Sequence, residues 1–231
     1  MTAPLASVFT PSYNKGHYAA EAIGSVLAQD FTDFEYWILE NSTDGVTRQV
    51  IAPLLGDPRI IYEEITLTPE ERQGSYPAAL LLNRYYPKAN GRYIFYLSDD
   101  DLFDPECVGR CVSFMEEDGS RRVCFFSHRH VTLAGGGGFA PCGGIWALDP
   151  MGAGTGLPVV DSRIDGGQIA HRKDCLDVLD QPWFPEDAEQ GIACHADGLF
   201  MQKLAEHFTF HPITDVLATA RRTELSLWAR A

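Results

Sequence analysis

The stretch RYIFYLSDDDLFDP, residues 92–105, decides how this chain folds. Its first part, Arg92–Leu97, is a strongly apolar run, typical of a strand that is buried on both faces of a parallel sheet. Three adjacent carboxylates, Asp99, Asp100 and Asp101, follow almost at once. Parallel α/β sheets bind their ligands outside the carboxyl ends of the strands. The stretch therefore predicts a buried strand with an acidic ligand site at its end.

Three neighbouring carboxylates repel one another unless a cation compensates their charge. Mg²⁺ or Mn²⁺ is the natural cation, because both prefer oxygen ligands and are often held by one or two carboxylates and a substrate's phosphates. The structural alternative is a solvated acidic turn that starts the next helix, with Asp104 as N-cap and Pro105 in the first helical position. This segment alone leaves both interpretations open.

Strand and helix patterns alternate on both sides of this stretch through the first 130 residues. We expect strands at residues 5–10, 34–39, 59–63, 92–97 and 122–127, and helices at 17–29, 47–55, 76–86 and from 104 onward. Such alternation predicts a mainly parallel sheet with helical crossovers.

The pattern changes after residue 130. Residues 135–138 are four glycines, which predict a mobile loop or a hairpin tip. We expect helices near residues 173–179 and 197–207, followed by a pair of strands at 208–213 and 216–220. No second domain boundary stands out, so we expect one domain over residues 1–231.

The charge balance limits the classes of partner. Eighteen basic against 32 acidic residues give a formal net charge of −14, which disfavours nucleic acid and anionic membranes. No apolar segment is long enough to span a bilayer, and the start of the chain lacks the pattern of a signal peptide. The six cysteines form no C-x-x-C pair, and Cys107 and Cys111 suit helix packing better than a disulfide. We therefore expect a cytoplasmic protein without membrane insertion.

Five motifs occur in a fixed order along the first half. They are residues 7–14 (SVFTPSYN), residues 25–31 (SVLAQDF), residues 40–45 (ENSTDG), Asn83 with Gly91, and the acidic cluster before Pro105. This succession resembles family 2 glycosyltransferases of the GT-A fold, closely over about residues 5–130 and more loosely over 160–228. The resemblance implies a Rossmann-like three-layer α/β/α sandwich with a small acceptor-side region. Residues 1–130 would form the nucleotide-sugar-binding half and residues 131–231 the acceptor-binding half.

The resemblance also implies a donor site. Its expected residues are Pro11, Tyr13, Asn14, Glu40, Asn83, Ser98 and Asp99. Pro11 and Tyr13 would line the base pocket, and Glu40, where the family more often has Asp, would accept hydrogen bonds from the base or ribose. Ser98 stands where the family has its first Asp and offers the ribose only a hydroxyl group. Leu82 stands where the family often has a basic residue.

Counting back from Pro105, the resemblance implies that Asp100 holds the metal. An Asp-x-Asp pattern of Asp99 with Asp101 points the other way, because successive side chains along a strand face opposite sides. We favour Asp100 on spacing and keep Asp99 as the alternative.

The second half would supply the base and the acceptor contacts. Asp197 matches the family's Asp at the start of the acceptor-side helix, which takes the proton of the acceptor hydroxyl, whereas Ala196 replaces the Glu before it. Arg221 and Ser226 match the family's closing segment. Gln168 or His171 would contact the acceptor.

The resemblance implies an inverting, metal-dependent glycosyltransferase that uses a nucleoside diphosphate sugar, with UDP as the expected carrier. One alternative is a non-catalytic nucleotide-sugar-binding relative, which Leu82, Ser98 and Ala196 would fit. Another is a nucleotidyltransferase, which normally has a glycine-rich, basic loop after the first strand. Residues 11–16 fit that loop poorly.

Overall fold

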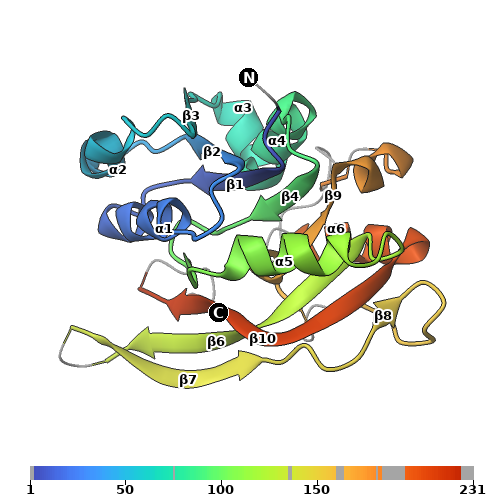
Figure 1. Ribbon diagram of the computed structural model, residues 1–231. Coiled ribbons are helices and arrows are strands. Elements are labelled where there is room, and N and C mark those ends of the chain that lie inside the picture. Colours follow the sequence, from blue (N-terminus) through green and yellow to red (C-terminus); the bar gives the residue numbers. More distant parts are fainter. Residues whose placement is uncertain are drawn as a thin grey trace.

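The computed structural model is shown in Figure 1. It describes residues 3–74, 76–134, 137–159, 164–180, 182–183 and 196–224. Within these ranges no helix is both long and apolar enough to cross a membrane.

One mixed sheet runs through the described part of the chain. Its main path is β3 (Ile60–Glu64), β2 (Phe34–Glu40), β1 (Ala6–Ser12), β4 (Tyr93–Tyr96), β9 (Ile169–Arg172), β6 (Val123–Leu133), β10 (Thr209–Arg222) and β5 (Leu102–Phe103). β7 (Phe139–Ile145) pairs with β6, and β8 (Met151–Gly152) pairs with β10. Figure 1 shows β6, β7 and β10 as long curved strands that run together.

The first four strands form one parallel part of the sheet, and β6 with β10 forms another. β1 lies between β2 and β4 and is parallel to both, and β3 continues the order beyond β2. β2 and β4 are buried along their whole length, as expected for apolar strands covered on both faces. Ser12 pairs with Glu40 at the carboxyl ends of β1 and β2, so the loops after these strands open on the same edge.

Helices cover both faces of the sheet. α1 (His17–Leu27) and α5 (Cys107–Glu116) bury their apolar side chains in one cluster, and α4 (Pro77–Tyr85) and α6 (Ala196–His207) do so in a second cluster. The shorter helices are α2 (Val46–Ile51), α3 (Pro69–Gly74) and the 3₁₀ segments Ala52–Leu54, Tyr86–Lys88, Gly166–Gln168 and Lys173–Val178. The predicted α/β/α layering with a mainly parallel sheet is confirmed.

Three local expectations need correction. The strands predicted at 208–213 and 216–220 are one strand, β10, which stays paired with β6 across register shifts between Ile213 and Ala218. Asp104 is not a helix cap, because α5 begins at Cys107 and Asp104 Oδ2 accepts a hydrogen bond from Arg129 Nη2 at 2.5 Å. The short strands β5, β8 and β9 and the helix α3 were not predicted.

Two other expectations agree with the structure. β6 and β7 form an antiparallel hairpin, so the glycine run joins two strands, although residues 135 and 136 lie outside the described residues. Cys107 and Cys111 are free thiols on the buried face of α5, as the helical spacing predicted.

Candidate functional site

The acidic turn lies between β4 and β5. Its main chain folds tightly, since the Asp101 N–H donates to Ser98 O at 3.2 Å. Asp99 is 6% exposed and Asp100 is 8% exposed, whereas Ser98 is exposed. A solvated turn would leave such carboxylates in water. Their burial therefore requires partners, and each of the three aspartates has a different one.

Asp99 binds the loop that follows β1. The Tyr13 N–H donates to Asp99 Oδ2 at 2.8 Å. Burial raises the pKa of Asp99 to about 7, and the charge of Asp100 adds to this rise, whereas the Lys15 ammonium opposes it. Asp99 thus joins the turn to the β1 loop and titrates near neutral pH.

Asp100 lies against a cation. Lys15 Nζ is 2.6 Å from Asp100 Oδ2, and the Thr223 hydroxyl donates to the same oxygen at 3.5 Å. Arg221 Nε donates to the main-chain carbonyl of Asp100. The carboxylate is therefore stabilised by positive charge and hydrogen-bond donors from two distant segments.

Asp101 binds the main chain at the end of β10. The Arg221 N–H donates to Asp101 Oδ1 at 2.7 Å. The pKa of Asp101 is well above its ordinary value, mainly because of burial and the charge of Asp100. The Arg221 guanidinium also bonds Glu21 and the Tyr18 carbonyl, so β10 is fixed against both the acidic turn and α1.

The loop after β1 is itself rigidly held. Asn14 has a positive φ of 53°, and its side-chain Oδ1 accepts hydrogen bonds from the main-chain N–H of Thr43 at 2.8 Å and of Asp44 at 3.2 Å. The Asn14 N–H donates to the Ser42 hydroxyl at 2.9 Å. Asn14 is thus bound to the turn after β2, and these bonds fix the main chain between Tyr13 and Lys15.

Asp197 occupies the first turn of α6. Its Oδ2 accepts a hydrogen bond from the Gly166 N–H at 3.0 Å, and its Oδ1 accepts one from the Gly198 N–H at 2.9 Å. A Cβ atom on Gly166 would lie 2.9 Å from Asp197 Cβ. Glycine at 166 is therefore required for the close approach of the two segments.

A second carboxylate, Asp165, lies near Asp197. Its side chain accepts from the Gly167 N–H at 2.9 Å. Burial raises the pKa of Asp165 to about 6, and the charge of Asp197 adds to the rise. The sequence prediction missed Asp165, although it stands next to the Gly-Gly pair that lets the backbone approach Asp197.

Tyr76, at the N-terminal end of α4, lies within electrostatic range of both Asp197 and the acidic turn. Burial raises the pKa of its phenol, and the charges of Asp197, Asp99 and Asp100 raise it further, in that order. These carboxylates thus act on one side chain. The structure brings the predicted base and the predicted metal ligands into one region, around a tyrosine that the sequence prediction did not select.

Two predicted base-pocket residues lie near this region's outer edge. Tyr13 is 45% exposed, and the Arg72 guanidinium lies 4.8 Å from its ring centre. Pro11 is partly buried near the end of β1. The Tyr13 ring is therefore partly exposed, with the Arg72 guanidinium over one of its faces.

Glu40 lies at the end of β2 and is fully buried. Its Oε2 accepts from Arg48 Nε at 2.5 Å, and its Oε1 accepts from the Ser42 N–H at 2.6 Å. Both oxygens are thus bound to the protein, and Glu40 orders the turn that also holds Asn14.

The other three residues predicted to contact a ligand form hydrogen bonds within the protein. Asn83 exchanges hydrogen bonds with the Trp183 main chain. Gln168 is fully buried between Asp165 N and Phe126 O, and His171 is fully buried with Nε2 3.0 Å from the Tyr96 hydroxyl. Burial lowers the pKa of His171 to about 4. The hydrogen bonds of these three side chains are thus made inside the protein. The predicted residue Ser226 lies outside the described residues.

Gln29, in the second motif, is a structural residue. Its Nε2 donates to Asp104 O at 2.8 Å, and its Oε1 accepts from the Val108 N–H at 2.9 Å. It satisfies a main-chain donor in the first turn of α5 and binds that helix to the end of α1.

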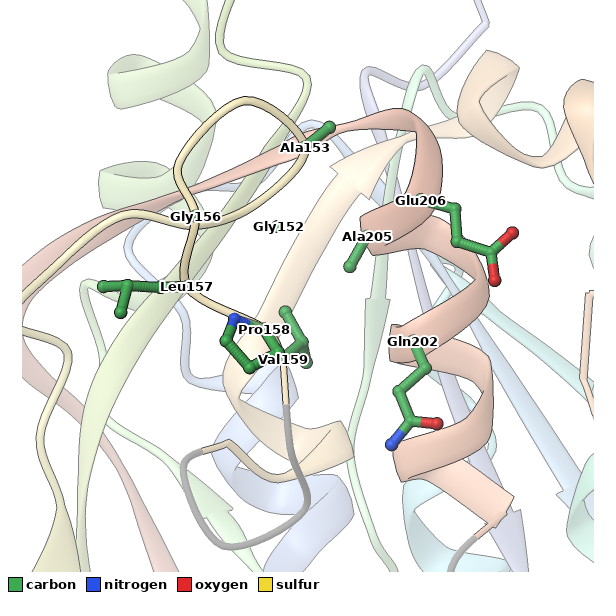
Figure 2. A pocket seen from close by; sticks show the side chains of 9 residues that line it. All are labelled: Gly152, Ala153, Gly156, Leu157, Pro158, Val159, Gln202, Ala205 and Glu206. Carbon is green, nitrogen blue, oxygen red and sulfur yellow. The ribbon is translucent and has the colours of Figure 1, made fainter.

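A cavity of about 510 Å³ lies along the second half of α6, beside the loop after β8 (Figure 2). Pro158, Val159 and Ala205 form its apolar wall, and Gln202 and Glu206 lie on the helix side. Asp197 does not line it: the nearest lining residue of α6, Gln202, is five residues further along the helix, about 7.5 Å at 1.5 Å per residue. The cavity is therefore separate from the carboxylates.

Comparison with known proteins identifies the family. The sequence profile of glycosyl transferase family 2 matches residues 7–132, more than half of the chain. Protein CgeD of Bacillus subtilis is 27% identical over 220 residues, which cover 94% of this chain and 50% of CgeD. The chain spans about half the length of the curated relatives that it matches first.

Two solved structures share the fold. TarS of S. aureus, residues 1–349 in complex with UDP-GlcNAc, matches with a TM-score of 0.71 and 20% identity over 98% of this chain and 61% of that chain. The mannosyltransferase PcManGT from Pyrobaculum calidifontis, in complex with GDP-Man and Mn²⁺, matches with a TM-score of 0.65 and 17% identity over 95% and 57% of the two chains. By its sequence profile and by a fold that agrees with it, this chain belongs to glycosyl transferase family 2.

Proposed function

We propose that this protein is an inverting glycosyltransferase that moves a sugar from a nucleoside diphosphate donor, with UDP as the expected carrier, to an acceptor hydroxyl. The observation that carries the proposal is the convergence of Asp99, Asp100 and Asp197 on one region at the carboxyl ends of the parallel strands. Family membership supports the chemistry, and the UDP-GlcNAc complex of TarS supports the choice of carrier.

The donor would lie between the loop after β1 and the acidic turn. Tyr13 presents an exposed ring that can stack on a base. Asn14 and Glu40 hold the adjacent turn, which positions that ring. Ser98, exposed beside Asp99, has a hydroxyl available to the ribose.

Asp100 fits a divalent cation by the chemistry of its surroundings. Its Oδ2 already attracts a cationic group, the Lys15 ammonium at 2.6 Å, and carboxylate oxygen is the ligand type that Mg²⁺ and Mn²⁺ prefer. Among the described residues no three His, Cys, Asp or Glu side chains form a ready ligand set. Asp100, with Asp99 as the alternative, would therefore hold the ion together with the donor's phosphates. A bound Mg²⁺ or Mn²⁺ would offset the negative charge of the departing diphosphate.

Asp197 would be the general base. Two main-chain N–H groups fix its carboxylate, so its direction is set before the acceptor arrives. It would take the proton of the acceptor hydroxyl while that oxygen bonds to the anomeric carbon. The bond from this carbon to the diphosphate oxygen breaks in the same step, which inverts the configuration without a covalent sugar–enzyme intermediate.

Donor consumption tests the proposal. UDP-, dTDP- and GDP-sugars are incubated with the protein and Mn²⁺, with and without a panel of sugar acceptors, and nucleoside diphosphate release is measured. We expect release from one donor class, and strong reduction of that release in Asp197→Asn. Tight donor binding without any release would instead indicate a non-catalytic binding protein.

A further inference from the structure

Lys15 contacts the carboxylate that the proposed function assigns to the metal. Its Nζ is 2.6 Å from Asp100 Oδ2, and the two side chains are 15% and 11% exposed. This is a short, charge-assisted hydrogen bond in a poorly hydrated place. A divalent cation on the same oxygen would face the repulsion of an ammonium group at close range.

The main chain is fixed by hydrogen bonds on both sides of Lys15. Asn14 and Gly16, on either side of it, both have positive φ, 53° and 50°. Tyr13 N–H is bound to Asp99, and the Gly16 N–H donates to the Thr47 hydroxyl at 3.0 Å. The position of the Lys15 backbone is therefore determined, while its four-carbon side chain can still move between partners.

The position at which the family often has a basic residue is apolar in this chain. Leu82 stands at that position and is 4% exposed. Arg221 is bound to the Asp100 carbonyl, the Tyr18 carbonyl and Glu21. The Lys15 ammonium lies at the same edge as the donor site and can turn toward a phosphate.

We propose that Lys15 is a built-in counter-ion of Asp100, which leaves this carboxylate when a divalent cation and the donor bind and then pairs with the diphosphate. The inference rests on the proposed function, because it assumes that Asp100 is the metal ligand. Lys15 would weaken the binding of metal alone and strengthen the binding of the diphosphate, so that metal and donor bind best together.

The first test measures Mn²⁺ binding without nucleotide, by the electron paramagnetic resonance signal of the free ion. Lys15→Met keeps the length of the side chain and removes its charge, so we expect about tenfold tighter Mn²⁺ binding than in the wild type. Lys15→Arg retains the cation and should stay close to wild type. Lys88→Met, at an exposed site on the Tyr85 ring, changes the net charge equally and should have no effect.

The second test measures UDP and uridine binding by calorimetry at saturating Mn²⁺, the condition in which Lys15 is expected to have left Asp100. We expect Lys15→Met to weaken UDP binding about tenfold and to leave uridine binding unchanged, because uridine has no phosphate. Thermal unfolding of each variant checks that the fold is retained.

The outcomes separate the two proposals. If Lys15→Met binds Mn²⁺ and UDP like the wild type, while Asp100→Asn loses Mn²⁺ binding, the inference is wrong and the metal site stands. If the wild type consumes donor without binding Mn²⁺ at Asp100, the inference also fails, although the transferase assignment survives. Failure of the proposed function appears separately, as the absence of donor consumption under every condition.

Discussion

The three adjacent aspartates show how strongly the surroundings of a side chain decide its chemistry. Asp99 accepts from the Tyr13 N–H, Asp100 from the Lys15 ammonium, and Asp101 from the Arg221 N–H. The acidic pattern predicts a site, but these partners lie 85 to 120 residues away in sequence. The spacing to Pro105 favours Asp100 as the metal ligand, but the partners of the three side chains could not be predicted from the pattern.

At the residue scale, Asp197→Asn should lower turnover by at least ~100-fold, because an amide cannot accept the acceptor's proton. Donor affinity should stay nearly unchanged, since the amide oxygen can still accept the Gly166 N–H. Steady-state kinetics and donor titration measure the two quantities. Near-normal turnover would remove Asp197 from the mechanism.

Asp100→Ala should weaken nucleotide binding in Mn²⁺ at least ~10-fold, because the variant loses a charged oxygen ligand. Calorimetric titration with UDP and Mn²⁺ measures the effect. Asp104→Ala is the matched control, because Asp104 is engaged with Arg129 and should not alter binding. Equal affinity of Asp100→Ala and wild type would move the metal to Asp99 or elsewhere.

At the scale of elements, Gly166 should matter more than its neighbour. An alanine at 166 would bring Cβ to 2.9 Å from Asp197 Cβ, whereas an alanine at 167 meets only Asp165 Oδ1 at 3.5 Å, an ordinary contact. We therefore expect Gly166→Ala to reduce turnover at least ~10-fold through displacement of the base, with a smaller effect from Gly167→Ala. Equal kinetics of the two variants would contradict this role.

Local sequence predicts the elements whose burial pattern is regular. α1 buries Ala19, Ala22, Ile23 and Val26 at helical spacing, and β4 is a short apolar run, so both were found. β9 has four residues and is defined by pairing with β4 and β6, which no local pattern indicates. β10 was predicted as two strands with residues 214 and 215 between them, whereas pairing with β6 on both sides keeps the strand continuous.

The site follows the same rule. Asp197 and the acidic turn could be predicted as site residues because their motifs are local. Lys15, Tyr76 and Asp165 were not selected, since their importance comes from neighbours distant in sequence. Glu40, Gln168 and His171 were expected to contact ligands, and all three are buried in the structure. Their burial depends on how the sheet and the helices pack, which the local sequence does not indicate.

At the scale of the whole molecule, the buried acids make stability depend on pH. The folded-state pKa is about 7 for Asp99 and about 6 for Asp165, both above the ordinary value near 4. The folded state therefore binds more protons than the unfolded state between about pH 4 and 7. The contribution of these two groups to the free energy of unfolding is complete below this window. It falls as pH rises through the window, by on the order of 1.4 kcal/mol per pH unit for each group.

Urea unfolding in EDTA from pH 5 to pH 8 measures this slope. Asp99→Asn should flatten it and unfold at higher urea than the wild type at pH 8, because the asparagine carries no charge to bury. Asp149→Asn, at an exposed position, should keep the wild-type slope. A slope that is unchanged in Asp99→Asn would show that Asp99 is ionised at little cost.

The contact between Arg221 and Asp101 spans 120 residues and has a consequence for biosynthesis. A nascent polypeptide leaves the ribosome with its three aspartates long before Arg221, which bonds Asp100 and Asp101, is translated. Until then the mutually repelling acids lack one of their stabilising segments, and loop closure over such a length is slow. A ribosome-stalled chain ending before β10 should therefore bind no donor, so that competence for sugar transfer arises only after nearly all of this sequence has been synthesised.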